Sequence, residues 1–555
     1  MQYTALTSSL ISTTRRFLIT CLILATATIA GTLGAAQSHA QSPEANSFDP
    51  AAALDTFLTR EDFPEQHARL TQLEQQVLQL ISDEPLKLGS LGSAILDIYP
   101  GSLTGHLAMT KFYAHVDQTE SLAQHTQSLQ AIMDHLASVG DGTMLGPWPV
   151  ASIYEAQAYA VYEAAQVAGA IYQMPDGFDL VYLLAIKAPD QPLQTRTFDI
   201  SHLLHKYNET NPRSEAQAEP WLFIRDRARQ NDSAAQTAIG AAYARYENFT
   251  EATGWLKIAS SSGNVLASSL LARIYYTQST SEQEPEKLAE LKDLTLDSYM
   301  QAIALGSTEA MYNLANLYIS NYYGEENAEA ALPLLEQAAA LSHTPATIYL
   351  GHLYNNGIQV EQDQAQAEVW FAQAAADQDP AGVLTYGRFL FANKRTSANP
   401  ELIEQLKQLS ADGNAEAMVV LGNLHARGYT VKPSVRQAVR WYKKAVKADP
   451  QNASIVNEVA WTLTVTDIKT LQRARYARRV MNKMMQTNLN AAARPEYLDT
   501  WAATHAANGN FERAVELQQQ ALEAANAQQR SDVIGILETH LALFEKGDVV
   551  SEATP

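Results

Sequence analysis

Histidine is the residue type in this chain best suited to metal binding, and the sequence contains 13 histidines. Only His202 and His205 stand three positions apart, a spacing that puts two imidazole rings on one face of a helix. A zinc site needs three or four suitable ligands, and no carboxylate completes a set beside this pair. We therefore predict no metal site, and expect the two histidines to mark a helix end beneath a β-hairpin.

Other patterns that carry chemistry are missing from the sequence. It has no nucleophile-elbow motif, no zinc-protease motif and no phosphate-binding glycine loop. The segment 140–142 is too short and too acidic to hold a phosphate, and it indicates a turn. Adjacent carboxylates such as Glu61 and Asp62 are common among 60 acidic residues, so spacing alone does not identify a catalytic pair. No catalytic residue and no cofactor is predicted.

One segment reverses the charge of the rest of the chain. The 555 residues include 39 Lys and Arg against 60 Asp and Glu, a net charge of −21. Between Lys432 and Lys483, twelve basic residues face three acidic ones, a net charge of +9. Such a segment can orient an acidic protein or an anionic glycan, whereas the overall acidity disfavours nucleic acid as a partner.

The cations of this segment that we predict to face a partner are called the basic patch. They are Arg436, Arg440, Lys443, Lys444, Lys447, Arg475, Arg478 and Arg479. The alternative is that they form solvated helix faces that pair with acidic neighbours.

A repeating pattern of helices must position these residues. A small residue suited to close helix packing recurs at intervals of 32 to 43 residues, at Gly240, Ala272, Ala315, Gly351, Gly387, Gly422 and Ala460. A second track recurs at intervals of 35 to 43 residues, at Ala259, Ala302, Ala338, Ala374, Leu409 and Ala445. Periods in this range indicate stacked helix-turn-helix units. The longest interval contains the polar insertion 277–286, which predicts a lengthened loop.

Two segments, 346–375 and 415–446, resemble the Sel1-like repeat family, with its paired Ala, Leu-Gly, Tyr, Gly, Val and Lys-Ala positions. The second departs from the family at Thr430 and Ser434, where Gly and Asp are usual. Segments 457–461 and 498–514 resemble tetratricopeptide repeats, which have the same antiparallel helix pair. The resemblance covers about 220–545. It implies an α-solenoid that serves as a scaffold for protein partners, including in envelope polysaccharide export.

In such families the first helices of the pairs line a concave groove. By analogy, the residues that follow the small packing positions are predicted to face that groove, and these are Asn316, His352, Arg388 and Asn423. The alternative is that they are only solvated.

Residues 41–215 do not repeat. Helical patterns occupy 64–82, 103–138 and 152–168. Two β-rich runs, 178–188 and 195–200, are joined by a Pro-Asp-Gln-Pro turn and predict an antiparallel hairpin. The predicted fold class is therefore mainly α, a solenoid of Sel1- and TPR-like helix-turn-helix repeats preceded by a smaller α+β domain with a β-hairpin.

Residues 1–40 have the pattern of a secretory signal peptide. They contain Arg15 and Arg16, no acidic residue, an apolar run over 17–33 and a small-residue end at Ala40. We predict cleavage after Ala40 and a periplasmic location, with the general and twin-arginine export routes both open. The only cysteine lies in this peptide, so no disulfide is expected afterwards. No later run is apolar for about 18 residues, so no transmembrane helix is predicted.

The predicted domains are the signal peptide 1–40, an α+β domain 41–215, Sel1-like repeats 220–450, TPR-like repeats with a capping helix 451–545, and a flexible tail 546–555. The predicted function is that of a non-enzymatic, exported adaptor. The alternative is a hydrolase with its site in the α+β domain or in a groove between that domain and the repeats. A hydrolase should show a deep pocket holding carboxylates or histidines of perturbed pKa, whereas an adaptor should show an open groove.

Overall fold

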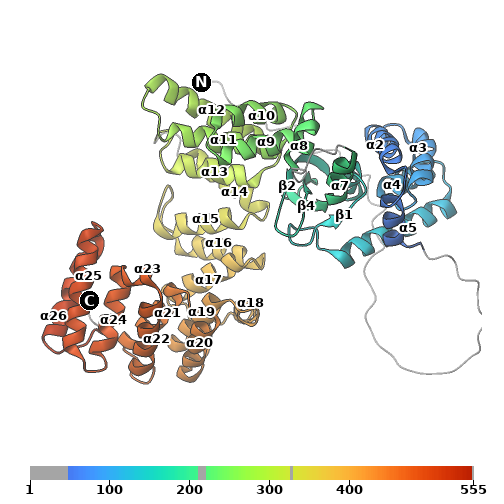
Figure 1. Cartoon of the computed structure of the whole chain (residues 1–555). Helices are drawn as coiled ribbons and strands as arrows, with labels where there is room; N and C mark the ends of the chain where they lie inside the picture. The colour runs from blue at the N-terminus through green and yellow to red at the C-terminus, as the bar shows by residue number, and fades with distance from the viewer. Residues whose placement is uncertain (1–47, 211–219, 325–328, 553–555) are drawn as a thin grey trace, which may run out of the picture. The chain divides into compact units, whose positions relative to one another are not determined.

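A computed structural model of the chain describes residues 48–210, 220–324 and 329–552 (Figure 1). The described residues from Asp49 onward form one compact unit. The predicted signal peptide, 1–40, lies outside the described residues. The fold is mainly α, with one small sheet near the amino terminus, as predicted.

Helices precede and flank the sheet. They are α1 (Pro50–Leu58), α2 (Phe63–Leu80), α3 (Pro85–Ile98), α4 (Leu103–His115), α5 (Thr119–Val139), α6 (Ile153–Tyr162) and α7 (Ser201–Thr210). Proline in the first turn starts α1, α2 and α3, and serine side chains cap α4 and α6. The helical stretch predicted over 103–138 is divided into two helices, because Asp117 takes a left-handed conformation (φ 55°) that separates α4 from α5.

The sheet contains four strands, β1 (Trp148–Pro149), β2 (Gln166–Gln173), β3 (Val181–Lys187) and β4 (Gln194–Asp199), in the order β1-β4-β3-β2. The predicted hairpin is confirmed, since β3 and β4 pair antiparallel with Tyr182 opposite Phe198. The helix predicted over 152–168 ends early, because β2 begins at Gln166. A short apolar run such as β2 does not by itself distinguish a strand from a buried helix end.

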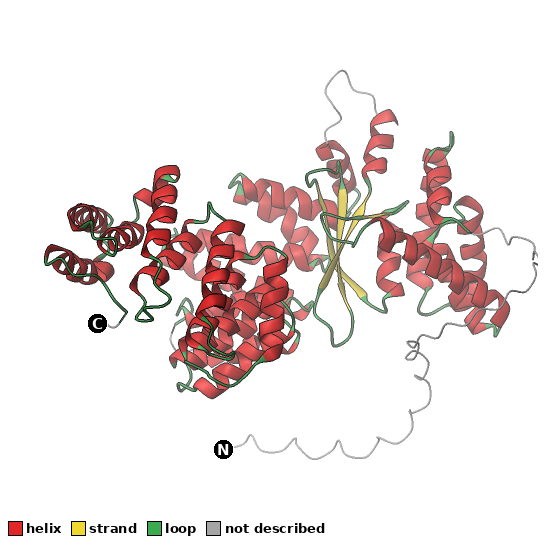
Figure 2. Ribbon diagram, turned by 90° about the horizontal axis from the view of Figure 1, so that it is seen from below, coloured by secondary structure: helices red, strands yellow, loops and turns green. Residues whose placement is uncertain are grey.

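Helices cover both sides of the sheet (Figure 2). On one face, Tyr159 of α6 packs edge-on against Phe198, with ring centroids 5.9 Å apart. On the other face, Ala168 and Ala185 belong to the same hydrophobic cluster as Val265, which lies in the repeat array. The sheet therefore shares a core with the first repeats.

The chain from α8 onward is an array of helices in which short turns join consecutive pairs (Figure 1). The first helices of the pairs are α9 (Ser233–Arg245), α11 (Val265–Ser279), α13 (Thr308–Ile319), α15 (Thr344–Asn356), α17 (Pro380–Ala392), α19 (Ala415–Arg427), α21 (Ala453–Val465) and α24 (Pro495–Ala506).

The second helices are α10 (Phe249–Ser261), α12 (Pro285–Ala304), α14 (Ala331–Ala340), α16 (Gln364–Ala376), α18 (Pro400–Ala411), α20 (Val435–Ala448), α22 (Ala474–Thr487) and α25 (Phe511–Ala527). Three helices lie outside these pairs, α8 (Pro220–Arg229), α23 (Leu489–Ala492) and α26 (Ser531–Glu545).

The small residues of the repeat allow the two helices of a pair to approach closely. A Cβ atom at Gly351 would lie 2.6 Å from Phe371 Cε1, and one at Gly422 would lie 2.5 Å from Tyr442 Cε1. The departure at Thr430 leaves the turn intact, since this residue adopts a left-handed φ of 61°. Ser434 likewise caps α20 by accepting a hydrogen bond from the Gln437 amide (3.3 Å).

We expect Gly422→Ala to lower the free energy of unfolding by about 1 to 3 kcal/mol, because the new methyl group overlaps the buried Tyr442 ring. Gly535→Ala is the matched control, since a Cβ atom at this position in α26 meets nothing within 4 Å. That change should stabilise the helix by about 0.5 to 1 kcal/mol. Urea denaturation followed by circular dichroism measures both, and equal effects would contradict the packing role of Gly422.

The loop predicted from the insertion 277–286 is wrong. Helix α11 continues to Ser279, α12 starts at Pro285, and the extra residues lengthen the helices. Helix α12 has 20 residues, whereas α16 in a regular repeat has 13. The insertion is rich in Ser, Thr, Gln and Glu, yet Glu and Gln are good helix formers, so a polar segment can extend a helix as readily as a loop.

The segment after α26, expected to be a flexible tail, is held against the repeats over the residues that the structure describes. Val550 is buried, and the amide of Glu552 donates a hydrogen bond to the Val465 carbonyl (2.8 Å). The Glu552 carboxylate also pairs with Arg427. Residues 546–552 thus extend the packed array.

Candidate functional site

The four residues predicted to face a groove lie on the first helices α13, α15, α17 and α19, and they differ in their surroundings. Asn316 is half-buried, while His352 is exposed and packs edge-on against Phe371, with ring centroids 5.1 Å apart. Arg388 is exposed and forms an ion pair with Glu416 (2.8 Å).

Asn423 is the exception, because both ends of its amide are used inside the protein. Its Oδ1 accepts a hydrogen bond from the hydroxyl of the buried Tyr442 (2.8 Å), and its Nδ2 donates to Glu458 Oε1 (3.3 Å). These bonds join α19, α20 and α21. Asn423 is therefore a packing residue of the array as well as a predicted groove residue.

A pair of substitutions separates these roles. Asn423→Ala is expected to lower the free energy of unfolding by about 1 to 2 kcal/mol, because the Tyr442 hydroxyl loses its acceptor. Arg388→Ala removes only an exposed ion pair and should change stability by about 0.5 kcal/mol or less. Thermal unfolding measures the loss of stability in each variant. If Arg388→Ala lost more stability than Asn423→Ala, the packing role of Asn423 would be contradicted.

The basic patch lies on two consecutive second helices. Helix α20 carries five Lys or Arg residues and helix α22 carries four, and neither helix contains an acidic residue. The patch residues are exposed except for Arg478, which is half-exposed. Within the residues that the structure describes, none of the patch cations forms an ion pair, and their exposure suits a solvated helix face as well as a surface for a partner.

Aromatic rings, rather than carboxylates, contact several of these cations. Lys443 Nζ lies 5.4 Å and Arg479 Cζ lies 5.3 Å from the centroid of the Tyr476 ring. Lys444 Nζ lies 4.5 Å from the centroid of the Trp441 ring. Such contacts are weakly favourable and leave the positive charge uncompensated.

A groove runs between α20 and α22. It encloses a cavity of about 350 Å³ lined by Lys443, Val446, Lys447, Pro450, Val456, Tyr476, Arg479, Val480, Lys483 and Met484. A second, shallower hollow lies on the α20 surface and is lined by Arg436, Val439, Arg440, Lys443, Lys444 and Lys447. The groove and the four predicted groove residues do not form one site, since none of the four lines the groove and its cations stand on second helices.

The α+β region contains a buried carboxylate pair that sequence reasoning missed. Glu74 of α2 is 0% exposed and Glu155 of α6 is 3% exposed. Glu155 accepts hydrogen bonds from the Leu103 amide (2.8 Å) and the Ala151 amide (2.7 Å), at the amino-terminal ends of α4 and α6. Glu74 accepts hydrogen bonds from the hydroxyls of the capping residues Ser102 and Ser152.

Burial governs the protonation of this pair. It raises the pKa of Glu74, and the neighbouring Glu155 charge raises it further. Burial also raises the pKa of Glu155, while its two backbone amide donors oppose that change. Because amides stabilise a carboxylate, we infer that Glu155 is the ionised partner and that Glu74 holds the proton near neutral pH.

This pair has the perturbed pKa values expected of catalytic groups but lacks access for a substrate. The cavity that Glu155 reaches has a volume of only about 20 Å³, which is room for about one water molecule but not for a substrate. The oxygen atoms of both carboxyl groups already have hydrogen-bond partners within the protein. The arrangement is that of a structural junction between α2, α4 and α6.

His202 and His205 point to different partners. His205 Nε2 lies 2.6 Å from Asp179 Oδ2 at the surface, whereas His202 Nε2 lies 3.4 Å from the Ala151 carbonyl oxygen. Burial lowers the pKa of His202 and of the nearby His67 to about 4, so both rings are neutral at pH 7. In the described parts of the chain, no three potential metal ligands come together.

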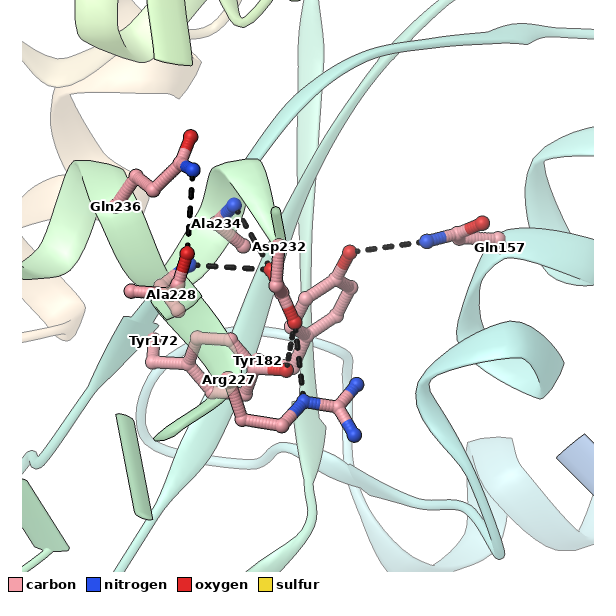
Figure 3. Close-up of polar contacts among 9 residues, drawn as sticks. Gln157, Tyr172, Tyr182, Arg227, Ala228, Asp232, Ala234 and Gln236 are labelled. Carbon is pink, nitrogen blue, oxygen red and sulfur yellow. Dashed lines mark hydrogen bonds and ion pairs between the residues drawn. The ribbon is translucent and has the colours of Figure 1, made fainter. Parts of the chain in front are cut away.

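A second polar network, also missed, joins the sheet to the repeats (Figure 3). Asp232 caps α9 through the amides of Ala234 and Ala235. Its Oδ2 also accepts a hydrogen bond from the Tyr172 hydroxyl of β2 (2.8 Å) and pairs with Arg227 Nε of α8 (3.1 Å). One carboxylate therefore connects three elements.

The signals for these missed residues were weak in the sequence. Asp232 precedes a helical pattern, as a capping residue does, but capping says nothing of Tyr172 or Arg227. Glu74 and Glu155 sit in ordinary helical segments, where a glutamate is normally on the solvated face. Only the three-dimensional packing shows that these helices bury their carboxylates.

Comparison with known proteins places part of this array in a repeat family. The Sel1 repeat family matches residues 308–343, 344–379 and 415–450. These segments correspond to the pairs α13–α14, α15–α16 and α19–α20, so the basic helix α20 lies in a matched repeat. The Sel1-repeat-containing protein YjcO of Escherichia coli K12 is 27% identical over 165 residues, which are 29% of this chain and 68% of that protein.

Matches among solved structures include two repeat proteins. A Sel1 repeat protein from Oxalobacter formigenes is 18% identical and covers 45% of this chain and 98% of its own, with a TM-score of 0.32. A protective antigen of uropathogenic Escherichia coli strains, which displays an SLR fold, is 17% identical and covers 83% of this chain and 97% of its own, with a TM-score of 0.33.

Proposed function

Because the chain carries Sel1 repeats within a longer array of helix pairs, we propose that it is a non-enzymatic, exported scaffold that binds a protein partner in the cell envelope. Proteins built from such repeats generally serve as interaction scaffolds. The observation that carries the proposal is the exposed basic surface of α20 and α22, whose cations form no ion pair among the described residues. An exposed surface of one charge steers and orients an oppositely charged partner.

The export part of the proposal is supported by the amino-terminal sequence. Residues 1–40 combine two arginines, an apolar run and a small-residue cleavage end. Among the helices that the structure describes, none combines the length and apolar composition needed to cross a membrane. Fractionation of cells that produce the tagged chain tests this part, and retention in the cytoplasm would contradict it.

In-cell crosslinking of the tagged chain, followed by mass spectrometry, tests the scaffold itself. We expect one or a few proteins to crosslink in stoichiometric amounts, with crosslinked positions inside residues 310–480. A matched sample of unfolded or truncated repeats should lose these crosslinks. If no protein is captured, the scaffold proposal fails, and the α+β region should be assayed for hydrolysis instead.

A further inference from the structure

The groove between α20 and α22 combines an apolar floor with cationic walls. Val446, Val456 and Met484 of the floor are buried in one hydrophobic cluster, against which Tyr476 and Val480 are partly buried. The floor residues Tyr476, Val480 and Met484 follow each other at four-residue spacing, so they form a line along α22 about 12 Å long. This length suits a segment of about four extended residues.

Both walls of the groove carry positive charges. Lys443 and Lys447 stand on the α20 wall, and Arg479 and Lys483 stand on the α22 wall. Lys443 and Arg479 approach one ring, that of Tyr476, from the two walls, at 5.4 Å and 5.3 Å from its centroid. Both cations are exposed and border the same groove, so a carboxylate bound beside the Tyr476 ring would be attracted to both.

The floor argues against a glycan and against a lipid surface. A glycan needs hydrogen-bonding groups for its hydroxyls, but most of the floor is aliphatic, and the one aromatic ring already contacts two cations. A membrane would be contacted by apolar side chains that protrude, whereas these apolar side chains lie between cations and are buried or half-buried. An acidic peptide segment with an apolar side chain fits both the floor and the walls.

We propose that this groove binds a short acidic segment of a partner protein, in which apolar side chains are flanked by Asp or Glu on both sides. The apolar side chains would enter the 350 Å³ cavity, and the carboxylates would pair with Lys443, Lys447, Arg479 and Lys483. The proposal rests on the scaffold function proposed above and names the chemistry of the partner.

The test uses fluorescence anisotropy with the mature chain, residues 41–555, and a labelled peptide, Ser-Asp-Glu-Leu-Glu-Phe-Asp-Glu-Ser. A second peptide replaces the Leu and Phe by Gly. At low salt we expect the first peptide to bind at least about 10-fold more tightly than the second, because only the first fills the floor. Binding should weaken as salt rises, since the walls act through charge.

Two double variants separate the groove from the general field of the segment. Lys443→Glu with Arg479→Glu is expected to weaken binding about 30-fold or more, because both walls lose their cations. Lys432→Glu with Lys469→Glu changes the segment by the same charge, at exposed positions outside the groove. This control should weaken binding about 3-fold or less. Val480→Ser should weaken binding of the peptide that contains Leu and Phe several-fold and leave binding of the glycine peptide unchanged.

Four results would overturn the proposal. Equal losses for the two double variants would show a diffuse field, and equal affinities for the two peptides would show that the floor is unused. Binding to dextran sulfate or to phosphatidylglycerol vesicles, without binding of the peptide, would assign the patch to a glycan or a lipid. A partner that crosslinks elsewhere on the repeats would preserve the scaffold function while this proposal fails.

Discussion

Replacing Asp232 with leucine is expected to lower the free energy of unfolding of the junction between the sheet and the repeats by about 3 to 4 kcal/mol. The change removes the cap of α9, the acceptor of the buried Tyr172 hydroxyl and the partner of Arg227. Loss of a cap costs about 1 kcal/mol, and a buried hydroxyl without a partner costs about 1 to 3 kcal/mol. The Arg227 side chain is 25% exposed, so solvent screening reduces the stability lost when its ion pair with Asp232 is removed.

Matched variants show which part of the network matters. Asp232→Asn keeps a capping oxygen but loses the charge, so we expect a loss of about 1 to 2 kcal/mol. Adding Arg227→Leu to Asp232→Leu should recover part of the stability, because no unpaired charge remains. Hydrogen exchange of the β2 and α9 amides reports the local change. If exchange became faster in α9 but not in β2, Asp232 would act only as the cap of α9, which would contradict its role at the junction.

The buried carboxylate pair is expected to make the α+β region less stable as the pH rises above about 6.5. The folded state keeps a proton on Glu74 after the unfolded chain has lost it, because burial raises the pKa of this carboxyl. Stability therefore falls with pH until the raised pKa is passed, at a rate of up to about 1.4 kcal/mol per pH unit.

The buried histidines act in the opposite direction at lower pH. Burial lowers the pKa of His67 and His202 to about 4, so the unfolded chain binds more protons between that value and the ordinary histidine pKa of about 6.5. Their contribution raises stability with pH in that window and then becomes constant. Above about pH 6.5, the change of stability with pH therefore comes from the carboxylate pair.

Glu74→Gln isolates this effect, because glutamine keeps the shape of the side chain and removes its titration. Above pH 6.5, the free energy of unfolding of this variant should change less with pH than that of the natural chain. At pH 8 the variant should be at least as stable as the natural chain. Glu155→Gln should instead lose about 2 to 3 kcal/mol at every pH, since its amide group cannot accept from both Leu103 and Ala151. Urea denaturation at pH 6.5, 7.25 and 8 tests both predictions. If the free energy of unfolding of Glu74→Gln fell with pH as steeply as that of the natural chain, the assignment of the proton to Glu74 would be refuted.

The site was only partly predictable from the sequence. The charge of residues 432–483 could be counted from the sequence, whereas the structure places the patch on second helices. The sequence could not predict that Lys443 and Arg479 contact the same tyrosine ring, because this contact depends on how one repeat stacks on the next. For the same reason, Asn423 proved to bridge three helices.

The sequence by itself determined the fold class and the repeat register, because the spacing of small and apolar residues along a helix is a local property that close packing requires. The tertiary structure alone decided where polar groups are buried. Glu74 meets Glu155, and Tyr172 meets Asp232, across long stretches of chain. It also decided that β2 is a strand, since pairing with β3 outweighs the weak local preference of a short apolar run. Contacts of this kind depend on the summed packing of many elements, which no local pattern encodes.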